Sequence, residues 1–502
     1  MLHLRPASTQ ETFQRSRRNR LITGALRLGF IALAIAKTLP AFCSAQFLYA
    51  TNNGALTITG YTGTGGTITV PSSSSGLPVT EIASFAFRAV TNLTAVTISE
   101  GITNVGFEAF ANCTALQSVQ LPKSTSSIGN WAFQGCTNLA TINVTPANAN
   151  YSSSSGVLFN AAQTQLIAYP AGKKGSYAIP ATVTNIELGA FGGCAALTAI
   201  SIPPSVLSIS DSAFYSCTGL RAVSIPGNVQ NIGTSAFFSC TNLVTAIIGD
   251  SVTNLQDYAF ASCFNLVDVQ LGSNVSTIGY GVFSYSGLTN LYLPASLTQM
   301  GDAAFEDCSN LASVVSGPNL IAIPNFAFDA CAALTNVRLS SNIATFGVNA
   351  FSRCADLKTV TIPKAVTNVS NAAFMNCSNL ASIYFLSSPP RIGAGIFSGD
   401  INATVYYDPL ASGWTNSFAG LPAIAWNATP SANVSGLGVG LGGFQFPIAG
   451  NSNLSFVVEA TKTLNNPTWA PIGTNTTSSG IIYFSDPNWT RTPTRFYRLR
   501  SP

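Results

Sequence analysis

Ten of the 11 cysteines in this chain occur at one repeated position, and a thiol can attack a substrate, bind a metal or form a disulfide. Each cysteine follows a phenylalanine by three residues, as in AFFSCTNL from Ala236 to Leu243. The same position holds Val90 and Ser286 in two further copies. Because valine and serine also satisfy this position, it requires a small, mostly buried side chain rather than a thiolate. The ten residues are Cys113, Cys136, Cys194, Cys217, Cys240, Cys263, Cys308, Cys331, Cys354 and Cys377.

The spacing of these thiols does not favour a metal or a catalytic centre. Structural zinc sites use converging ligands, typically with a C-x2-4-C pair, whereas these cysteines form a single file. The only histidine is His3, so beyond the N-terminal segment there is no Cys-His nucleophile and no Ser-His-Asp triad. We therefore predict no catalytic residue, no cofactor-binding residue, no metal ligand and no enzyme activity.

Disulfides are a second interpretation of cysteines in an exported chain. Neighbouring coils of a stacked repeat lie about 4.8 Å apart, which the Cα limits of a disulfide allow. Side chains in one column point the same way, however, so their Cβ atoms also lie about 4.8 Å apart, beyond the usual range. Buried free thiols are favoured, and occasional bridges stay an alternative.

One pair of carboxylates invites a comparison with glycoside hydrolysis, which needs two acidic residues and no histidine. Glu306 and Asp307 are adjacent in FEDC. Neighbouring residues need not converge on one ligand, and these two lie at an ordinary repeat corner. We expect them to be solvated charges.

These residues lie in a sequence repeat of 23 residues, and the repeat predicts the strands and turns that position them. The phenylalanines are spaced by that interval, with one step of 22 residues into Phe305 and one interruption between Phe133 and Phe191. Each unit reads A-F-x-x-C-x-x-L-x-x-V-x-I-P-x-x-V-x-x-I-G. The L-x-x-V-x-I part alternates like a short strand, Pro and Gly turn the chain, and A-F-x-x-C is expected to form a short helical or 3-10 corner. One unit cannot bury its apolar face alone, so the pattern predicts a stacked solenoid.

These motifs resemble the leucine-rich repeats of the BspA-like family. The resemblance covers residues 81–426 and implies a parallel-β solenoid. The interruption at about 145–180 (YSSSSGVLFNAAQTQLIAYPAGKKGSYAIP from Tyr151 to Pro180) looks like the family's hairpin insertion. Its AGKKG lacks the spacing and the hydroxyl of a phosphate-binding loop, which indicates a turn.

Both ends of the array are expected to be capped. Residues 46–80 carry two alternating segments that predict an N-terminal β cap. Residues 386–426 resemble the family's closing segment, in which Trp414, Phe418 and Trp426 are available to cover the last coil.

Residues 1–45 are typical of an export signal peptide. A basic RSRRNR precedes the apolar LGFIALAIA, and Cys43 and Ala45 are small residues at the −3 and −1 positions before Gln46. A membrane anchor is the alternative, although Lys37 interrupts a short apolar core. After this segment no apolar run approaches the ~20 residues that span a bilayer. We therefore expect a secreted or cell-surface protein whose mature chain has no transmembrane span.

The net charge of +4 is misleading, because residues 1–45 hold seven of the 22 basic residues and one of the 18 acidic ones. The remainder is slightly acidic, which argues against a nucleic-acid partner. With 47% hydrophobic and 8% charged residues, the chain is also too apolar to be disordered.

The composition shifts at the C-terminal end. Residues 427–443 read as a Gly/Ser-rich linker. Gly438, Gly440 and Gly443 have G-x-G-x-x-G spacing, but a strand rather than a helix is expected to follow, which argues against a dinucleotide site. Residues 444–502 alternate like strands and predict a small β module, loosely resembling those at the C-termini of large exported bacterial proteins. Such a module suggests envelope attachment.

Function in such solenoids usually lies on the outward positions of the strands. The candidate ligand face consists of Asp268, Gln270, Asn290, Tyr292, Asn336, Arg338 and Tyr384. The Tyr and Arg side chains are the expected anchors because both types are enriched at binding hot spots, although a merely solvated face is the simpler interpretation.

Three functions follow from the sequence. The first is non-enzymatic recognition of a protein or glycan, since the resemblance implies adhesion at the cell surface. The second is a structural or display scaffold that the C-terminal module attaches to the envelope. The third and remotest is a glycan-active enzyme.

Overall fold

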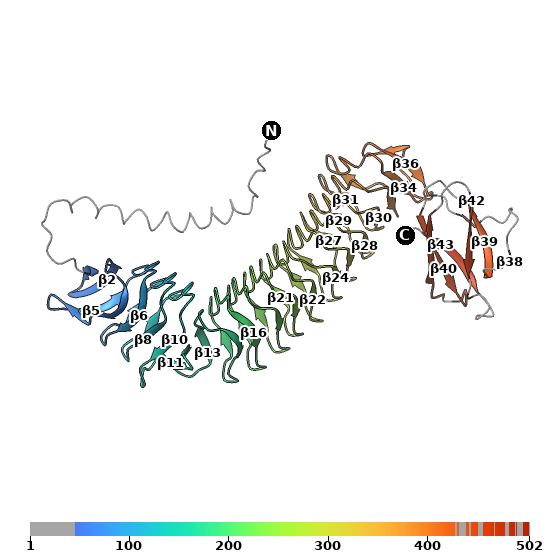
Figure 1. Ribbon diagram of the computed structural model, residues 1–502. Helices are drawn as coiled ribbons and strands as arrows, with labels where there is room; N and C mark the ends of the chain where they lie inside the picture. Colours follow the sequence, from blue (N-terminus) through green and yellow to red (C-terminus); the bar gives the residue numbers. More distant parts are fainter. Residues whose placement is uncertain are drawn as a thin grey trace.

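The chain forms a long solenoid with a small β module at its C-terminal end (Figure 1). The computed structural model describes residues 46–426, 429–430, 438–440, 443–449, 455–465, 467–476, 481–486, 488 and 495–500. The predicted signal segment, residues 1–45, lies outside them. No helix in the described part of the chain is long and apolar enough to cross a membrane.

The L-x-x-V-x-I segments form parallel strands that stack coil on coil, as predicted; we call their outward side the strand face. Side chains along each strand point alternately into the core and outward. In β18, for example, Val223 is buried between two exposed neighbours. The strands are β3 (Gly66–Val70), β6 (Leu93–Ile98), β8 (Ser118–Leu121), β10 (Thr141–Val144), β14 (Gly175–Ala178), β16 (Leu197–Ser201), β18 (Ala222–Ser224), β20 (Thr245–Ile247), β22 (Asp268–Gln270), β24 (Asn290–Tyr292), β26 (Ser313–Val315), β28 (Asn336–Arg338), β30 (Thr359–Ile362), β32 (Ser382–Phe385), β34 (Thr404–Tyr407) and β36 (Leu421–Ala425).

The V-x-x-I segments form a second series of parallel pairings, which we call the short-strand edge. Most of its strands hold two residues, of which the apolar one points into the core. They are β5 (Leu77–Ile82), β7 (Asn104–Val105), β9 (Ser127–Ile128), β13 (Gln165–Ala168), β15 (Asn185–Ile186), β17 (Ser208–Ile209), β19 (Asn231–Ile232), β21 (Asn254–Leu255), β23 (Thr277–Ile278), β25 (Gln299–Met300), β27 (Ala322–Ile323), β29 (Thr345–Phe346), β31 (Asn368–Val369) and β33 (Arg391–Ile392).

The A-F-x-x-C corners are turns, and the expectation of helical or 3-10 corners is wrong for the described residues. Ser235 and Ser239 have φ angles of 56° and 58°, in the left-handed region. Alternate amides therefore point in different directions. The Phe237 N–H donates to Ala259 O of the next coil (2.7 Å), while the Cys240 N–H donates to Phe237 O within its own coil (3.2 Å). A helix would use every amide internally, whereas this corner gives half of them to the neighbouring coil.

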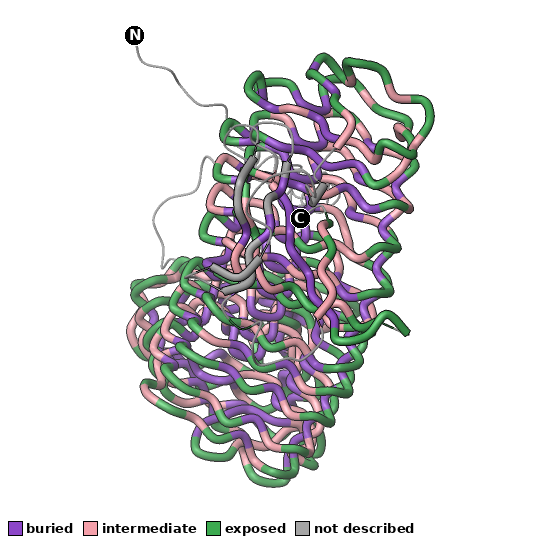
Figure 2. Tube along the Cα trace, turned by 90° about the vertical axis from the view of Figure 1, so that its right-hand side faces the viewer, coloured by how far each residue is buried: buried purple, intermediate pink, exposed green. Residues whose placement is uncertain are grey.

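Buried residues recur from coil to coil along the solenoid (Figure 2), and two of the buried side-chain columns lie at this corner. Phe237 is fully buried, and its ring stacks on Phe214 at 4.9 Å and on Phe260 at 5.0 Å between centroids. The neighbouring cysteine column is also buried, and all ten of its thiols are free. Such stacking couples each coil to its two neighbours only, which is the energetics of a repeat array.

The insertion joins two separate hydrophobic cores. Its hairpin of β11 (Tyr151–Ser154) and β12 (Val157–Asn160) is antiparallel. Leu158 packs into the core of the first coils, whereas Val157 and Phe159 pack into the core of the later ones. The chain then rejoins the array with Tyr169, whose N–H donates to Ala190 O (2.7 Å) and whose ring stacks on Phe191 at 4.9 Å. Tyr169 thus takes a place in the phenylalanine column.

Caps cover both ends of the array. At the N-terminal end, an antiparallel hairpin of β1 (Phe47–Asn52) and β2 (Ala55–Tyr61) pairs with β5, and β4 (Ser73–Ser74) also pairs with β5. At the C-terminal end, β35 (Ser417–Phe418) folds back on β36. Trp414 stacks on Tyr407 at 4.8 Å and contacts Phe418 at 5.0 Å between centroids.

The C-terminal module consists of two antiparallel sheets that share a small apolar core. Two strands from residues 427–443, the range predicted to be a linker, pair with β39. Gly440 pairs with Gly443 in a tight hairpin, so the three spaced glycines do not begin a helix. The strands are β37 (Thr429–Pro430), β38 (Gly438–Gly440), β39 (Gly443–Ala449), β40 (Ser455–Thr461), β41 (Ala470–Thr476), β42 (Ile481–Asp486) and β43 (Phe496–Arg500).

Candidate functional site

The C-terminal module packs against the strand face of the last coils, and Tyr384 of β32 mediates this contact. Tyr384 is 1% exposed, and its ring stacks on Tyr406 of β34 at 5.2 Å. The backbone N–H of Ser455 donates to the Tyr384 hydroxyl (2.8 Å). Burial raises the pKa of Tyr384 to about 12. The prediction that Tyr384 is an exposed ligand anchor is therefore wrong, because the module covers it.

A groove of about 950 Å³ lies between the module and the strand face beside this contact. Its volume is at the upper end of the range typical of small-molecule sites. One wall is formed by β28, β30 and the loop after β34, and the other by β40, β41 and β43. The apolar residues of the lining include Leu339, Leu386, Leu410, Val457 and Leu499.

Three hydrogen-bond donors in the groove have no partner within the described part of the chain. Arg338 of β28 and Lys364 after β30 are exposed and form no ion pair there. The indole nitrogen Nε1 of Trp426 is buried and has no hydrogen-bond acceptor. A groove with an apolar lining and two free cations can bind an apolar segment that carries a carboxylate.

The predicted ligand face is divided between two regions. Asn336 and Arg338 line the groove together with the covered Tyr384. Asp268, Gln270, Asn290 and Tyr292 lie outside it, on the open strand face of β22 and β24.

The open part of the face remains accessible. Tyr292 is 71% exposed, and Ile247 of the neighbouring β20 is 44% exposed. The pairing register places Ile247 opposite Gln270.

The repeat pattern indicated Arg338 but not the opposite wall. Lys364 lies on the same wall as Arg338, one coil further on, whereas Trp426 and the module residues Val457 and Leu499 meet it through a contact between segments far apart in the sequence. The only available signals were the isolated tryptophan after the last repeat and the change of composition that follows it.

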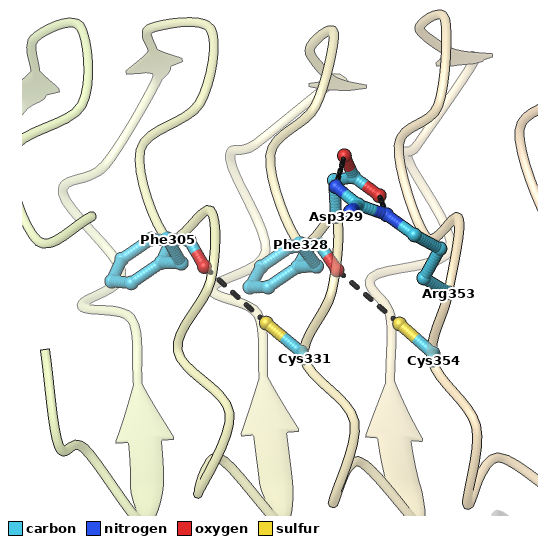
Figure 3. Close-up of polar contacts among 6 residues, drawn as sticks. All are labelled: Phe305, Phe328, Asp329, Cys331, Arg353 and Cys354. Carbon is cyan, nitrogen blue, oxygen red and sulfur yellow. Dashed lines mark hydrogen bonds and ion pairs between the residues drawn. The ribbon is translucent and has the colours of Figure 1, made fainter. Parts of the chain in front are cut away.

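The cysteine column has a hydrogen-bonding role that the sequence did not reveal (Figure 3). The Cys331 thiol donates to Phe305 O (3.3 Å) and the Cys354 thiol to Phe328 O (3.2 Å), each in the preceding coil. The same contact recurs from Cys113 to Cys377. Burial raises the pKa of the Cys308 thiol to about 12, so this thiol is a donor rather than a nucleophile.

In the last coil, Asp400 replaces the cysteine of this column. It follows Phe397 by three residues, the position of the cysteines, and it is 1% exposed. Neither carboxylate oxygen has a hydrogen-bond donor within the described residues. Burial raises the pKa of Asp400 to about 7, because an isolated charge is costly in an apolar setting.

The adjacent carboxylates at the corner, expected to be solvated charges, are only partly exposed. Burial, and then the neighbouring Asp307 and Asp329, raise the pKa of Glu306 to about 7. Arg353 binds both oxygens of the buried Asp329, as Figure 3 shows. The ion cluster lies outside the groove lining, and the described residues contain no group of three or more metal-binding side chains placed to hold an ion.

Comparisons with known proteins address the fold. A leucine-rich repeat protein from Bacteroides ovatus is 21% identical, with 73% of this chain and 94% of that chain covered and a TM-score of 0.47. A leucine-rich cell surface protein from Faecalibacterium prausnitzii is 23% identical, covering 77% and 98%, with a TM-score of 0.41. No curated protein matches.

The family comparison covers most of the chain. The model of the BspA-type leucine-rich repeat region, which comprises six copies, matches residues 67–174, 168–289 and 276–404. These matches span the array from the N-terminal cap to the last coils. The chain therefore belongs to the BspA-type leucine-rich repeat family.

Proposed function

We propose that this protein is an exported, non-enzymatic recognition protein whose groove binds an extended polypeptide segment carrying an acidic side chain. The observation that carries the proposal is the pair of unpartnered cations in the groove, Arg338 and Lys364. Both side chains attract a carboxylate. The leucines of the lining receive apolar side chains on either side.

An extended segment fits this groove better than a compact ligand. The floor is a strand face whose outward residues repeat from coil to coil, so contacts recur along the array rather than at one point. The neighbouring Tyr292 and Gln270 lie on the same series of strands and extend the surface available to a longer partner.

The proposed location is outside the cytoplasm, either secreted or at the cell surface. This rests on the N-terminal sequence, in which a basic segment, an apolar segment and a small-residue cleavage site follow one another.

The proposal is tested by selecting peptides from a random display library on the purified protein. Selected peptides should be enriched in Asp and Glu next to apolar residues. The double variant Arg338→Glu and Lys364→Glu should weaken them by tenfold or more, because two attractive contacts become repulsive. The matched control is Arg221→Glu, which changes an exposed arginine of the solenoid outside the groove lining. Equal affinity for the groove variant and the control would exclude the groove as the site.

The second candidate function is a scaffold that the C-terminal module attaches to the envelope. In the module, Phe446, Ile448, Phe456, Val458 and Phe484 form one apolar cluster with Tyr384 and Tyr406 of the solenoid, which joins the module to the array. Deleting residues 444–502 also removes one wall of the groove, so the groove variant is needed beside it. Release of the deleted chain from cells, with retention of the groove variant, would assign attachment to the module.

A further inference from the structure

A second hollow lies at the interruption of the array, far along the chain from the groove. We call it the notch; its volume is about 350 Å³. It is bordered by the corner that contains Trp131, by β11 and β13 of the insertion, and by the corner that follows β15. This volume is at the lower end of the range for small-molecule sites.

The notch exists because the short-strand edge lacks one strand there. In the regular array each coil bonds to the one before, as when the Ser126 N–H donates to Thr103 O (2.9 Å) and the Gly129 N–H to Val105 O (2.7 Å). The strand β9 has no partner on its other side. Across the described residues, no amide donates to the carbonyls of Ser126 and Ile128, which line the notch.

Ser126 is exposed and Ile128 is partly buried, so their carbonyl groups take donors from water or from a ligand. The Tyr151 hydroxyl accepts the Ile128 N–H (3.0 Å), so the donor side of this edge is satisfied while the acceptor side is open. The Glu187 carboxyl group adds further acceptors to the lining.

The side chains around these carbonyls are amides and one indole. Gln134 and Gln165 line the notch, and neither amide group forms a hydrogen bond within the described part of the chain. Trp131 forms a wall by lying on the glycine corner, where a Cβ at Gly189 would be 3.3 Å from its Cδ2. No lysine or arginine is among the lining residues.

We propose that the notch binds a sugar ring of a neutral glycan. Hydroxyl groups donate to the open carbonyls and to Glu187, and they both donate to and accept from the two glutamine amides. The C–H face of the ring packs on the Trp131 indole. The absence of cationic side chains from the lining argues against an anionic ligand. This site is independent of the groove and adds a glycan to its proposed polypeptide ligand.

The test uses the full chain and four named probes: cellotriose, maltotriose, xylotriose and N,N′,N″-triacetylchitotriose. Binding is followed by calorimetry and by the indole N–H resonances of the five tryptophans, with Trp131 assigned from Trp131→Phe. At least one probe should bind with a dissociation constant of about 1 mM or lower and shift the Trp131 resonance. This resonance locates the ligand without any destabilising substitution.

Substitutions of lining residues then show whether their side chains bind the probe or only lie near it. Gln134→Leu and Gln165→Leu should each weaken the bound probe by roughly three- to tenfold, as expected for a lost hydrogen bond. The matched control Gln256→Leu changes a glutamine at the corner position that Glu187 occupies in its own coil and should leave binding unchanged. Arg338→Glu with Lys364→Glu should also leave it unchanged. Failure of all four probes to bind, or binding that leaves the Trp131 resonance in place, would overturn the proposal.

Discussion

The coils around Phe237 are built from the same repeat as the coils around Tyr169 and Tyr384. The two regions differ in whether a hollow lies beside the coils. Around Phe237 every column is regular: the rings stack, the thiols donate to carbonyls of the preceding coil, and the backbone amides of the corner alternate between coils. Around Tyr169 a hairpin interrupts the repeat, whereas around Tyr384 the array continues and the C-terminal module covers its strand face. The notch lies at the interruption, and the groove lies between the module and the covered face. Regular coils therefore supply the scaffold, and the segments added to the repeat supply the hollows.

The largest expected effect is on the regular coils. Phe237→Ala should lower the free energy of unfolding by about 3 to 5 kcal/mol, because it removes a fully buried ring that stacks on both neighbours. Urea unfolding followed by amide exchange along the array is the measurement. The control is Phe238→Ala, which removes the adjacent, only partly buried ring. An equal loss from both variants would refute the column as the main stabiliser.

The next effect concerns the end of the array and depends on pH. The pKa of Asp400 is raised to about 7 in the fold from an ordinary value of 3.8. Between these two values the unfolded state loses its proton first, so the stability of the last coil should fall as the pH rises. Protection factors of the amides at residues 397–403, which are corrected for the intrinsic pH dependence of exchange, should therefore be lower at pH 8 than at pH 5.

Asp400→Cys restores the thiol of the regular column and should abolish this difference. Asp356→Asn, at an exposed carboxylate, is the control and should preserve it. Glu306 has a raised pKa of the same sign, which is why the measurement is made locally in the last coil rather than on the whole chain. Equal protection factors at residues 397–403 at the two pH values in the unmodified protein would contradict the assignment.

A smaller effect is expected in the cysteine column. Cys240→Ala should cost about 1 kcal/mol, because the bond to Phe214 O (3.2 Å) is lost. Cys240→Ser should cost less, since its hydroxyl can donate to the same carbonyl, and both should cost less than Phe237→Ala. The buried thiols should also resist labelling in the native protein. Rapid labelling, or a serine variant as unstable as Phe237→Ala, would refute this account.

The smallest effect tests the contact between solenoid and module. Tyr384→Phe keeps the ring on Tyr406 but removes the hydroxyl that accepts the Ser455 N–H, at a cost of about 0.5 to 1.5 kcal/mol. Faster amide exchange at Ser455 would report this loss. Tyr292→Phe, at an exposed hydroxyl, should change nothing. Unchanged exchange at Ser455 would mean that the module is held by its apolar contacts alone.

The solenoid was predictable because it rests on a local pattern repeated many times. The column of Phe237 and Cys240 is visible in any single unit, and stacking multiplies it. The corner conformation was not predictable from that pattern, since a run such as SAFFSC also suits a helical turn. Only the backbone hydrogen bonds between coils favour the left-handed φ angles of Ser235 and Ser239.

The sites were less predictable because they depend on contacts that periodicity does not contain. Alternation correctly placed Arg338 outward, but it also placed Tyr384 outward, and only the module 71 residues further on decides that Tyr384 is buried. Tyr169 and Asp400 occupy repeat positions with other residue types, so an alignment on Phe and Cys passes over them. The missing strand beside β9 is likewise a property of the assembled edge.

Because each coil bonds to its two neighbours, the number of coils sets the distance between two sites on the solenoid. Between the notch and the groove lie whole coils, each of which advances the structure by about 5 Å. Removing or duplicating one 23-residue unit in this stretch preserves every contact type on either side. The separation of the two hollows can therefore change in discrete steps by duplication of a unit, while their own residues stay the same.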